Sequence, residues 1–127
     1  MATNDSYLPA EYNTGIVRGD YFQETFTFTV DGESIDLTDC DARIQVKDLS
    51  NRVQFPVNLS EFIIEPDPSV ITGIKIIDEN SLQWSISDSD TKTFPPGTYQ
   101  YDIELTIGGK VRTYVRGQFN VERDITV

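Results

Sequence analysis

The chain of 127 residues contains no histidine and only one cysteine, Cys40. The lack of histidine excludes Ser-His-Asp and Cys-His catalysis and removes the commonest metal ligand. A lone cysteine cannot form a disulfide within the chain, which excludes the small secreted domains that disulfides hold together. Positive charge is also scarce, since 10 Lys and Arg stand against 21 Asp and Glu, for a formal charge of −11. Such a charge repels phosphate groups, so we expect neither nucleic acid nor a membrane surface as a partner.

Long hydrophobic runs are absent as well. No apolar stretch approaches the roughly 18 residues that a membrane-spanning helix needs. The opening segment, MATNDSYLPA, lacks the basic and apolar regions of a secretion signal. We therefore expect a protein that is made in a reducing cytoplasm. A length of 127 residues suits a single domain with one hydrophobic core.

Apolar and polar residues alternate along several short segments. In YFQETFTFTV at residues 21–30, the phenylalanines share one side of the chain and the threonines the other, which is the period of a strand with one buried face. The segment EPDP at 65–68 is predicted to be a loop, because proline cannot donate a backbone hydrogen bond to a sheet or helix. Further strands are predicted at 42–48, 74–77 and 81–87, with a weaker edge strand at 53–57.

The clearest signal is a hairpin near the end of the chain. The alternating segments 98–107 and 111–116 flank Gly108-Gly109-Lys110, and the two glycines suit the positive φ angles of a tight turn. Gly117 interrupts the second strand, where we predict a β-bulge. The single helix that we expect is one turn within 88–94.

These segments predict an all-β fold, an antiparallel β-sandwich of about seven or eight strands. The segment PGTY at 96–99, before a strand, is similar to the corner of immunoglobulin domains where a tyrosine hydroxyl bonds back to the preceding backbone. We therefore favour an immunoglobulin-like topology, in a version that lacks the cysteine pair of antibody domains.

The start of the chain differs from the rest. Residues 1–14 are polar and follow neither strand nor helix periodicity, and Tyr7, Leu8 and Tyr12 are scattered among them. We predict an extended N-terminal arm over 1–14 and a single immunoglobulin-like domain over 15–127. Aromatic and aliphatic side chains are unexpected in a purely solvated tail, so Tyr7, Leu8 and Tyr12 are candidates for contact with a neighbouring subunit.

The predicted C-terminal hairpin carries three of the ten basic residues, Lys110, Arg112 and Arg116. The period of a strand places Tyr114 on the same face as the two arginines. We predict that Arg112, Tyr114 and Arg116 form a basic stripe that docks on an acidic surface of a partner, such as another copy of this chain.

Two carboxylate pairs and one tripeptide have both a chemical and a structural interpretation. Asp39 with Asp41, and Asp88 with Asp90, lie in connections where carboxylates could ligate Ca²⁺, but neither segment has the spacing of an EF-hand loop. We interpret both pairs as turn residues and expect no cofactor. Arg18-Gly19-Asp20 spells the tripeptide that integrins recognise, and we interpret it as the turn that leads into the first long strand.

Aromatic residues could also form a sugar-binding face, as they do in carbohydrate-binding modules. Trp84 lies between Leu82 and Ile86 in its alternating segment, and Tyr99 and Tyr101 share the side of the apolar residues that follow them. This alternation favours burial in the core over an exposed binding face.

Four segments occur in a familiar order: VRGD at 17–20, IDLT at 35–38, ARIQV at 42–46 and PGTYQYDI at 96–103, followed by the closing hairpin. Together, and with Val111 and Gly117 in that hairpin, they resemble a family of small bacteriophage virion proteins, the immunoglobulin-like modules of phage tails and baseplates. The N-terminal domain of siphophage upper-baseplate proteins is one example. The resemblance spans 15–127, and the chain departs from it by ending in ITV instead of Val-Thr-Arg.

The resemblance implies a non-enzymatic structural protein of a virion, assembled in the cytoplasm of the host bacterium. It would act as an assembly or adaptor module of the tail or baseplate, in a symmetric arrangement of many copies with other virion structural proteins. Its arm, edge strands and C-terminal hairpin would bind the neighbouring subunits. The alternatives are a head-decoration or neck protein of the particle, and a carbohydrate-binding module that contacts host glycans.

Overall fold

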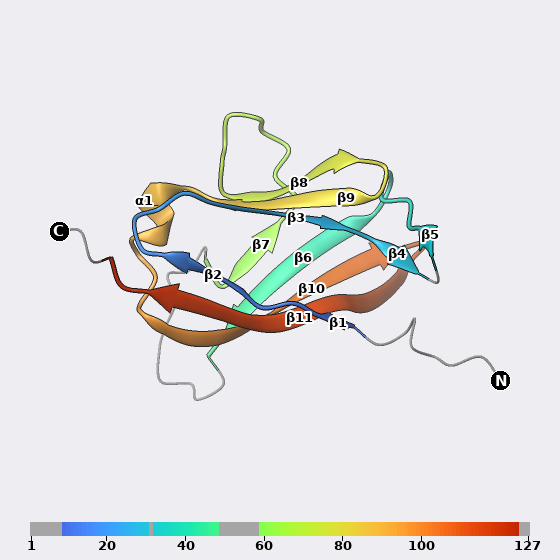
Figure 1. Ribbon diagram of the computed structural model, residues 1–127. Coiled ribbons are helices and arrows are strands. Elements are labelled where there is room, and N and C mark those ends of the chain that lie inside the picture. The colour runs from blue at the N-terminus through green and yellow to red at the C-terminus, as the bar shows by residue number, and fades with distance from the viewer. Residues whose placement is uncertain (1–8, 31, 49–58, 125–127) are drawn as a thin grey trace.

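The computed structural model describes residues 9–30, 32–48 and 59–124, whose strands form two sheets packed face to face and one small hairpin (Figure 1). The larger sheet has the order β1-β11-β10-β6-β7, with β2 also paired to β11; the smaller sheet has the order β3-β9-β8. The larger sheet consists of β1 (Ala10–Glu11), β2 (Thr14–Val17), β6 (Asp41–Lys47), β7 (Glu61–Ile63), β10 (Gly97–Ile107) and β11 (Lys110–Glu122). The remaining elements are β3 (Phe22–Thr27), β8 (Gly73–Asp78), β9 (Ser81–Ile86), the hairpin of β4 (Thr29–Val30) with β5 (Glu33–Ser34), and the helical turn α1 (Asp88–Thr91).

One aromatic core lies between the two sheets. Alternate residues of β6 and β10 are buried, as their alternation in the sequence requires. Trp84 of β9 is fully buried, and its ring centroid lies 5.0 Å from that of Phe22 in β3 and 5.3 Å from those of Phe62 in β7 and Phe119 in β11. Both sheets contribute to these contacts, and the prediction of an all-β fold built of packed sheets is confirmed.

Local sequence signals locate most of the elements. The β10–β11 turn contains Gly108 and Gly109 at φ angles of +59° and +79°, as a type I′ turn requires. The α1 turn begins after Ser87, whose side chain accepts a hydrogen bond from the backbone N–H of Asp90. The segment 65–68 is a loop, as predicted. The strand predicted over 21–30 is divided at Phe28, where the chain leaves the smaller sheet for the β4–β5 hairpin. The edge strand predicted at 53–57 lies outside the described residues.

The prediction of a bulge at Gly117 is wrong. The pairing of β10 with β11 shifts between Ile103, opposite Val115, and Glu104, opposite Thr113, so the extra residue of the bulge is Tyr114. Gly117 pairs regularly with Tyr101. A Cβ atom at Gly117 would lie 2.1 Å from the carbonyl oxygen of Tyr12, so this position needs glycine because the N-terminal segment crosses over it.

That crossing also changes the N-terminal boundary. β1 and β2 both pair with β11 in parallel and share one register, in which Ala10 lies opposite Val115 and Thr14 opposite Phe119. From Ala10 onward, the segment predicted as an arm is therefore an edge strand of the larger sheet. Alternation in 10–17 is too short to reveal a strand whose partner is the other end of the chain. Tyr7 and Leu8 lie outside the described residues.

Candidate functional site

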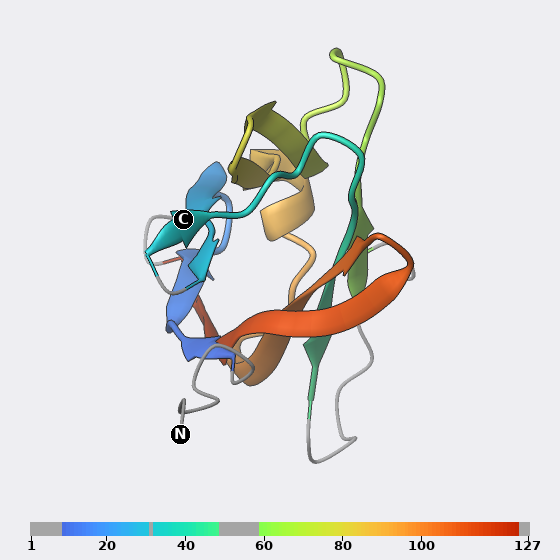
Figure 2. The same cartoon turned by 90° about the vertical axis from the view of Figure 1, so that its right-hand side faces the viewer.

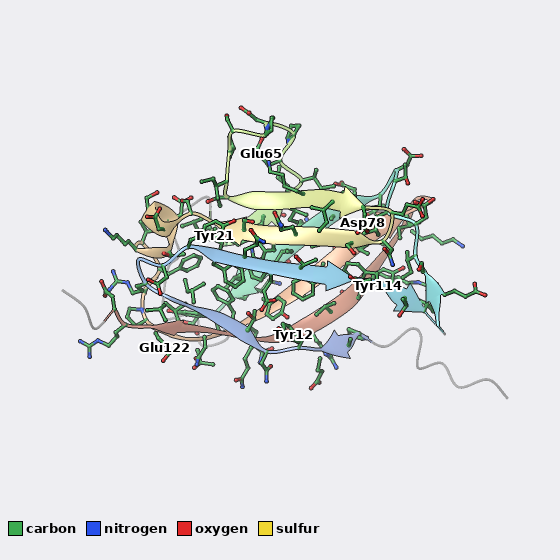
Figure 3. All side chains as sticks on the ribbon, turned by 45° about the horizontal axis from the view of Figure 1, so that its top comes forward. Tyr12, Tyr21, Glu65, Asp78, Tyr114 and Glu122 are labelled. Atoms are coloured by element: carbon green, nitrogen blue, oxygen red, sulfur yellow. The ribbon has the colours of Figure 1, made fainter. Side chains whose placement is uncertain are left out.

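Tyr12, one of the predicted partner-binding residues, lies at a seam between the two sheets (Figure 3). Its side chain is 46% exposed, and its ring packs edge-on against Phe26 with 5.7 Å between the ring centroids. The Tyr12 hydroxyl donates a 3.0 Å hydrogen bond to Oε1 of Glu24, which also accepts a 2.9 Å bond from the hydroxyl of Thr14. This carboxylate raises the pKa of Tyr12 through the hydrogen bond and its charge. Tyr12 therefore fastens the N-terminal strand to β3 within the chain.

The backbone of the same segment is held from the other side. The buried Tyr101 hydroxyl donates to the carbonyl oxygen of Tyr12, and the side-chain oxygen of Asn13 accepts a 2.9 Å bond from the backbone N–H of Gln118. Burial, with a smaller contribution from Glu24, raises the pKa of Tyr101. These contacts replace the regular ladder where the chain crosses Gly117.

The residues of the predicted basic stripe do not share a face. Arg112 lies opposite Leu105 and Arg116 opposite Asp102, and directly opposed residues project from the same side of a sheet. Leu105 is buried between the sheets, whereas Asp102 belongs to the alternate, outward-facing set of β10. The bulge therefore sends the two arginines to opposite sides. Tyr114 is half-buried, and its ring packs edge-on against Phe28.

The turn at Arg18-Gly19-Asp20 is fastened to α1. The fully buried Thr91 hydroxyl accepts a 3.0 Å hydrogen bond from the Gly19 N–H and is 2.9 Å from the Asp20 carbonyl oxygen. Arg18 donates a 2.6 Å bond through Nη2 to the carbonyl of Lys92. The tripeptide thus has the structural role that the sequence analysis assigned to it.

The two carboxylate pairs make local hydrogen bonds. Oδ1 of Asp41 accepts from the backbone N–H of Ala42, and Oδ1 of Asp88 accepts from that of Ser89. Oδ2 of Asp90 accepts a bond from the Thr72 hydroxyl. Within 9–30, 32–48 and 59–124, no group of three or more Asp, Glu or Cys side chains is placed to hold a metal ion.

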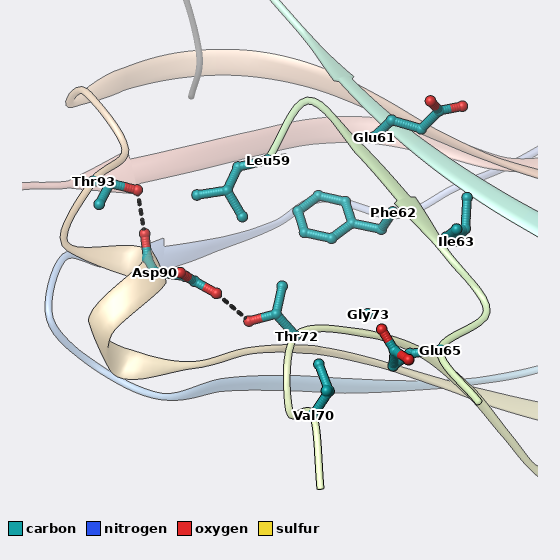
Figure 4. Close-up of a pocket in the computed structure, with 10 residues that line it drawn as sticks. All are labelled: Leu59, Glu61, Phe62, Ile63, Glu65, Val70, Thr72, Gly73, Asp90 and Thr93. Atoms are coloured by element: carbon teal, nitrogen blue, oxygen red, sulfur yellow. Dashed lines mark hydrogen bonds between the residues drawn. The ribbon is translucent and has the colours of Figure 1, made fainter. Parts of the chain in front are cut away.

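A hollow beside β7, which we call the β7 groove, is lined by residues of β7, the start of β8 and α1 (Figure 4). It encloses about 620 Å³ between β7, the start of β8 and α1. Leu59 and Phe62 contribute buried apolar surface, whereas Ile63 and Val70 are exposed. Acidic side chains also line it, namely Glu61, Glu65 and Asp90. No Lys or Arg does so among the described lining residues.

One side of the groove is a strand edge. β7 is the last strand of the larger sheet, and the backbone N–H of Val46 in β6 donates to the carbonyl of Ser60. Because the backbone groups of successive residues point to opposite sides of a strand, those of Glu61 and Ile63 face away from β6. β7 reaches the smaller sheet through one bridge, between Ile64 and Ile74.

The loop at 65–72 forms the opposite rim and projects from the sheets (Figure 2). Nζ of Lys75 donates to the carbonyls of Glu65, at 3.2 Å, and Asp67, at 2.9 Å. Oδ1 of Asp67 accepts from both the backbone and the hydroxyl of Ser69. These bonds hold the loop in a defined shape although it presents Val70 and Ile71 to solvent. The sequence analysis missed this surface. The feature that could have revealed it is the apolar pair Val70 and Ile71, which follows two prolines in an otherwise polar loop.

The groove combines a strand edge, exposed apolar side chains and negative charge, which suits the binding of a polypeptide segment. Within the described part of the chain, no helix has the length and apolar character to cross a membrane. The sequence matches none of the protein-family models and none of the curated proteins with which it was compared.

Proposed function

We propose that this chain is a non-enzymatic structural module of a bacteriophage particle, with an immunoglobulin-like topology, that binds neighbouring subunits of the tail or baseplate. The strand orders β11-β10-β6-β7 and β3-β9-β8 follow the G-F-C-C′ and B-E-D orders of immunoglobulin domains. The Tyr99 hydroxyl donates a 2.7 Å hydrogen bond to the carbonyl of Pro95 at the start of β10, as in a tyrosine corner. Both features support the topology, and the virion setting rests on the sequence resemblance.

Exposed apolar side chains on rigid backbone carry the proposal of a binding role. Ile63 is 61% exposed on β7, and Val70 is 38% exposed on the adjoining loop, which is held by Lys75. Apolar side chains in a fixed position lose little conformational entropy on binding, so a partner that covers them gains most of their transfer free energy. The polar side chains described above instead hold segments of the chain together.

The test is the presence of the chain in purified particles. An epitope-tagged copy is expressed in the infected host, particles are purified on a density gradient, and heads are separated from tails before quantitative mass spectrometry. We expect a fixed copy number in the tail fraction, since closed symmetric assemblies set the number of subunits. An unrelated cytoplasmic protein with the same tag is the control. Absence of the chain from particles would refute the proposal, and enrichment in heads would support the decoration or neck alternative.

A further inference from the structure

The β10–β11 turn is the positive feature of an acidic protein. Residues 105–121 contain no Asp or Glu, although the chain has 21 of them, and they contain Lys110, Arg112 and Arg116. Val111 lies between the first two of these basic residues, beside the turn, and is 58% exposed. Because side chains alternate along a strand, Val111 projects from one side of the hairpin and Lys110 and Arg112 project from the other.

The β7 groove has the complementary pattern. Its exposed apolar side chains, Ile63 and Val70, lie among the carboxylates of Glu61, Glu65 and Asp90. Glu61 is paired with Arg43 at 3.2 Å, so the charge complementarity rests mainly on Glu65 and Asp90. Its volume of about 620 Å³ is in the range of roughly 300–1,000 Å³ that accommodates several side-chain-sized groups. Copies of a chain with a charge of −11 repel one another, so a contact between copies is favoured where one copy offers its positive region and the other a negative one.

We propose that the β10–β11 turn of one copy docks in the β7 groove of a second copy. One side of the inserted turn would place Val111 over Ile63 and Val70, and its other side would turn the cations at 110 and 112 toward carboxylates of the groove. This contact deepens the proposed function, on which it rests, because it names the neighbour and the two surfaces that meet.

The β10–β11 turn and the α1 end of the groove lie far apart in one molecule. In Figure 1 the β10–β11 turn lies at the right end of the molecule, whereas α1, which borders the groove, lies at the left end. The turn itself is rigid, since the two strands pair up to Ile107 and Lys110. Within one copy, Val111 lines a separate hollow with Glu61 and Ile63. A rigid tip can fill the groove of another copy without rearrangement of either fold.

Charge-reversed variants test this pairing. Lys110→Glu alters the tip, and Glu65→Lys alters the groove. Sedimentation velocity over a concentration series should show self-association of the wild type that weakens with added salt. Each variant alone should associate at least about tenfold more weakly, because the contact then brings like charges together. An equimolar mixture of the two variants should regain association, since the acidic tip of one meets the basic groove of the other.

Controls separate this contact from net charge and from loop damage. Lys47→Glu and Glu122→Lys make the same charge changes on exposed positions outside both surfaces, and we expect them to associate like the wild type at matched salt. The backbone N–H of Asp67 donates to Oε2 of Glu65, so Glu65→Gln, which keeps an acceptor there, should weaken association less than Glu65→Lys does.

Two results would overturn the inference: a wild type that stays monomeric throughout the series, or a mixture of variants that fails to recover. The proposed function fails separately. If Lys110→Glu enters particles at the wild-type copy number, the hairpin contact is wrong and the virion role stands. If the wild type is absent from particles, the virion role is wrong whatever the sedimentation result.

Discussion

Replacement of Gly117 by alanine tests whether the N-terminal strand is part of the folded domain. The new Cβ atom would lie 2.1 Å from the Tyr12 carbonyl oxygen, whereas an ordinary carbon–oxygen contact is roughly 3.3 Å or longer. The crossing segment must therefore move by more than about 1 Å. The hydrogen bonds that the crossing makes, from Tyr101 to Tyr12 and from Gln118 to Asn13, depend on its present position.

The loss of stability expected for Gly117→Ala follows from those two hydrogen bonds. A buried hydroxyl left without its partner costs about 1–3 kcal/mol, and an ordinary hydrogen bond contributes about 1 kcal/mol. We expect Gly117→Ala to lower the free energy of unfolding by roughly 2–4 kcal/mol. For a domain of this size, that loss corresponds to a fall in Tm on the order of 10 °C. Urea unfolding followed by Trp84 fluorescence measures the free energy of unfolding, and thermal melting followed by circular dichroism measures Tm.

A truncated chain shows whether the cause is the contact with Tyr12. Without residues 1–13 there is no carbonyl above Gly117, so the same substitution should cost less than about 0.5 kcal/mol there. Gly109→Ala is the matched control, because nothing lies within 4 Å of its added Cβ but its φ angle is +79°. Its cost of about 1 kcal/mol should be equal in both backgrounds. A full-length Gly117→Ala protein as stable as the wild type would refute the crossing.

Three further predictions concern other contacts. Thr91→Val removes the hydroxyl that links Gly19 to Asp20, so unfolding by denaturant should show a loss of about 2–3 kcal/mol, and a loss below 0.5 kcal/mol would contradict this role. The pKa of the Tyr101 hydroxyl is raised in the folded chain, so as pH rises the unfolded chain loses this proton at a lower pH than the folded chain does. The contribution of Tyr101 to the free energy of unfolding should therefore be fully present below about pH 10 and decrease above it. Tyr101→Phe should make that fall shallower in alkaline denaturation, and an unchanged slope would be evidence against it. Deletion of 1–14 should lower the Tm in thermal melting, since Tyr12, Asn13 and Thr14 make the contacts described; a melting curve equal to that of the full chain would disprove this boundary.

Sequence patterns revealed the elements whose signals are local. Alternation in 42–48 and 98–107 located β6 and β10, and Gly108-Gly109 located their neighbouring turn. These signals are local because side-chain direction and turn geometry depend on residues that are adjacent in the chain. The burial of Trp84 followed from the same alternation.

Features that depend on a distant partner were not visible. β1 and β2 pair with β11, about a hundred residues further along, and their sequence shows only a few residues that are compatible with a strand. The bulge at Tyr114 broke the expected face of the basic stripe, because one extra residue reverses the side of every residue beyond it. Gly117 was recognised as unusual, but the reason for it is the N-terminal segment at Tyr12, which crosses over it.

The N-terminal strand also narrows the surfaces that remain for binding. Tyr12, which the sequence analysis assigned to a neighbour, binds Glu24 of its own chain, so the described part of the predicted arm stabilises the domain. The proposed contact instead joins two different surfaces, the β10–β11 turn and the β7 groove. A contact of this heterologous kind leaves one free turn and one free groove after each addition, so it produces rings when the rotation closes and filaments when it does not. A ring of fixed copy number fits the proposed baseplate position, so sedimentation that ends at one discrete oligomer would support the contact and agree with that position, whereas open-ended growth would support the contact alone.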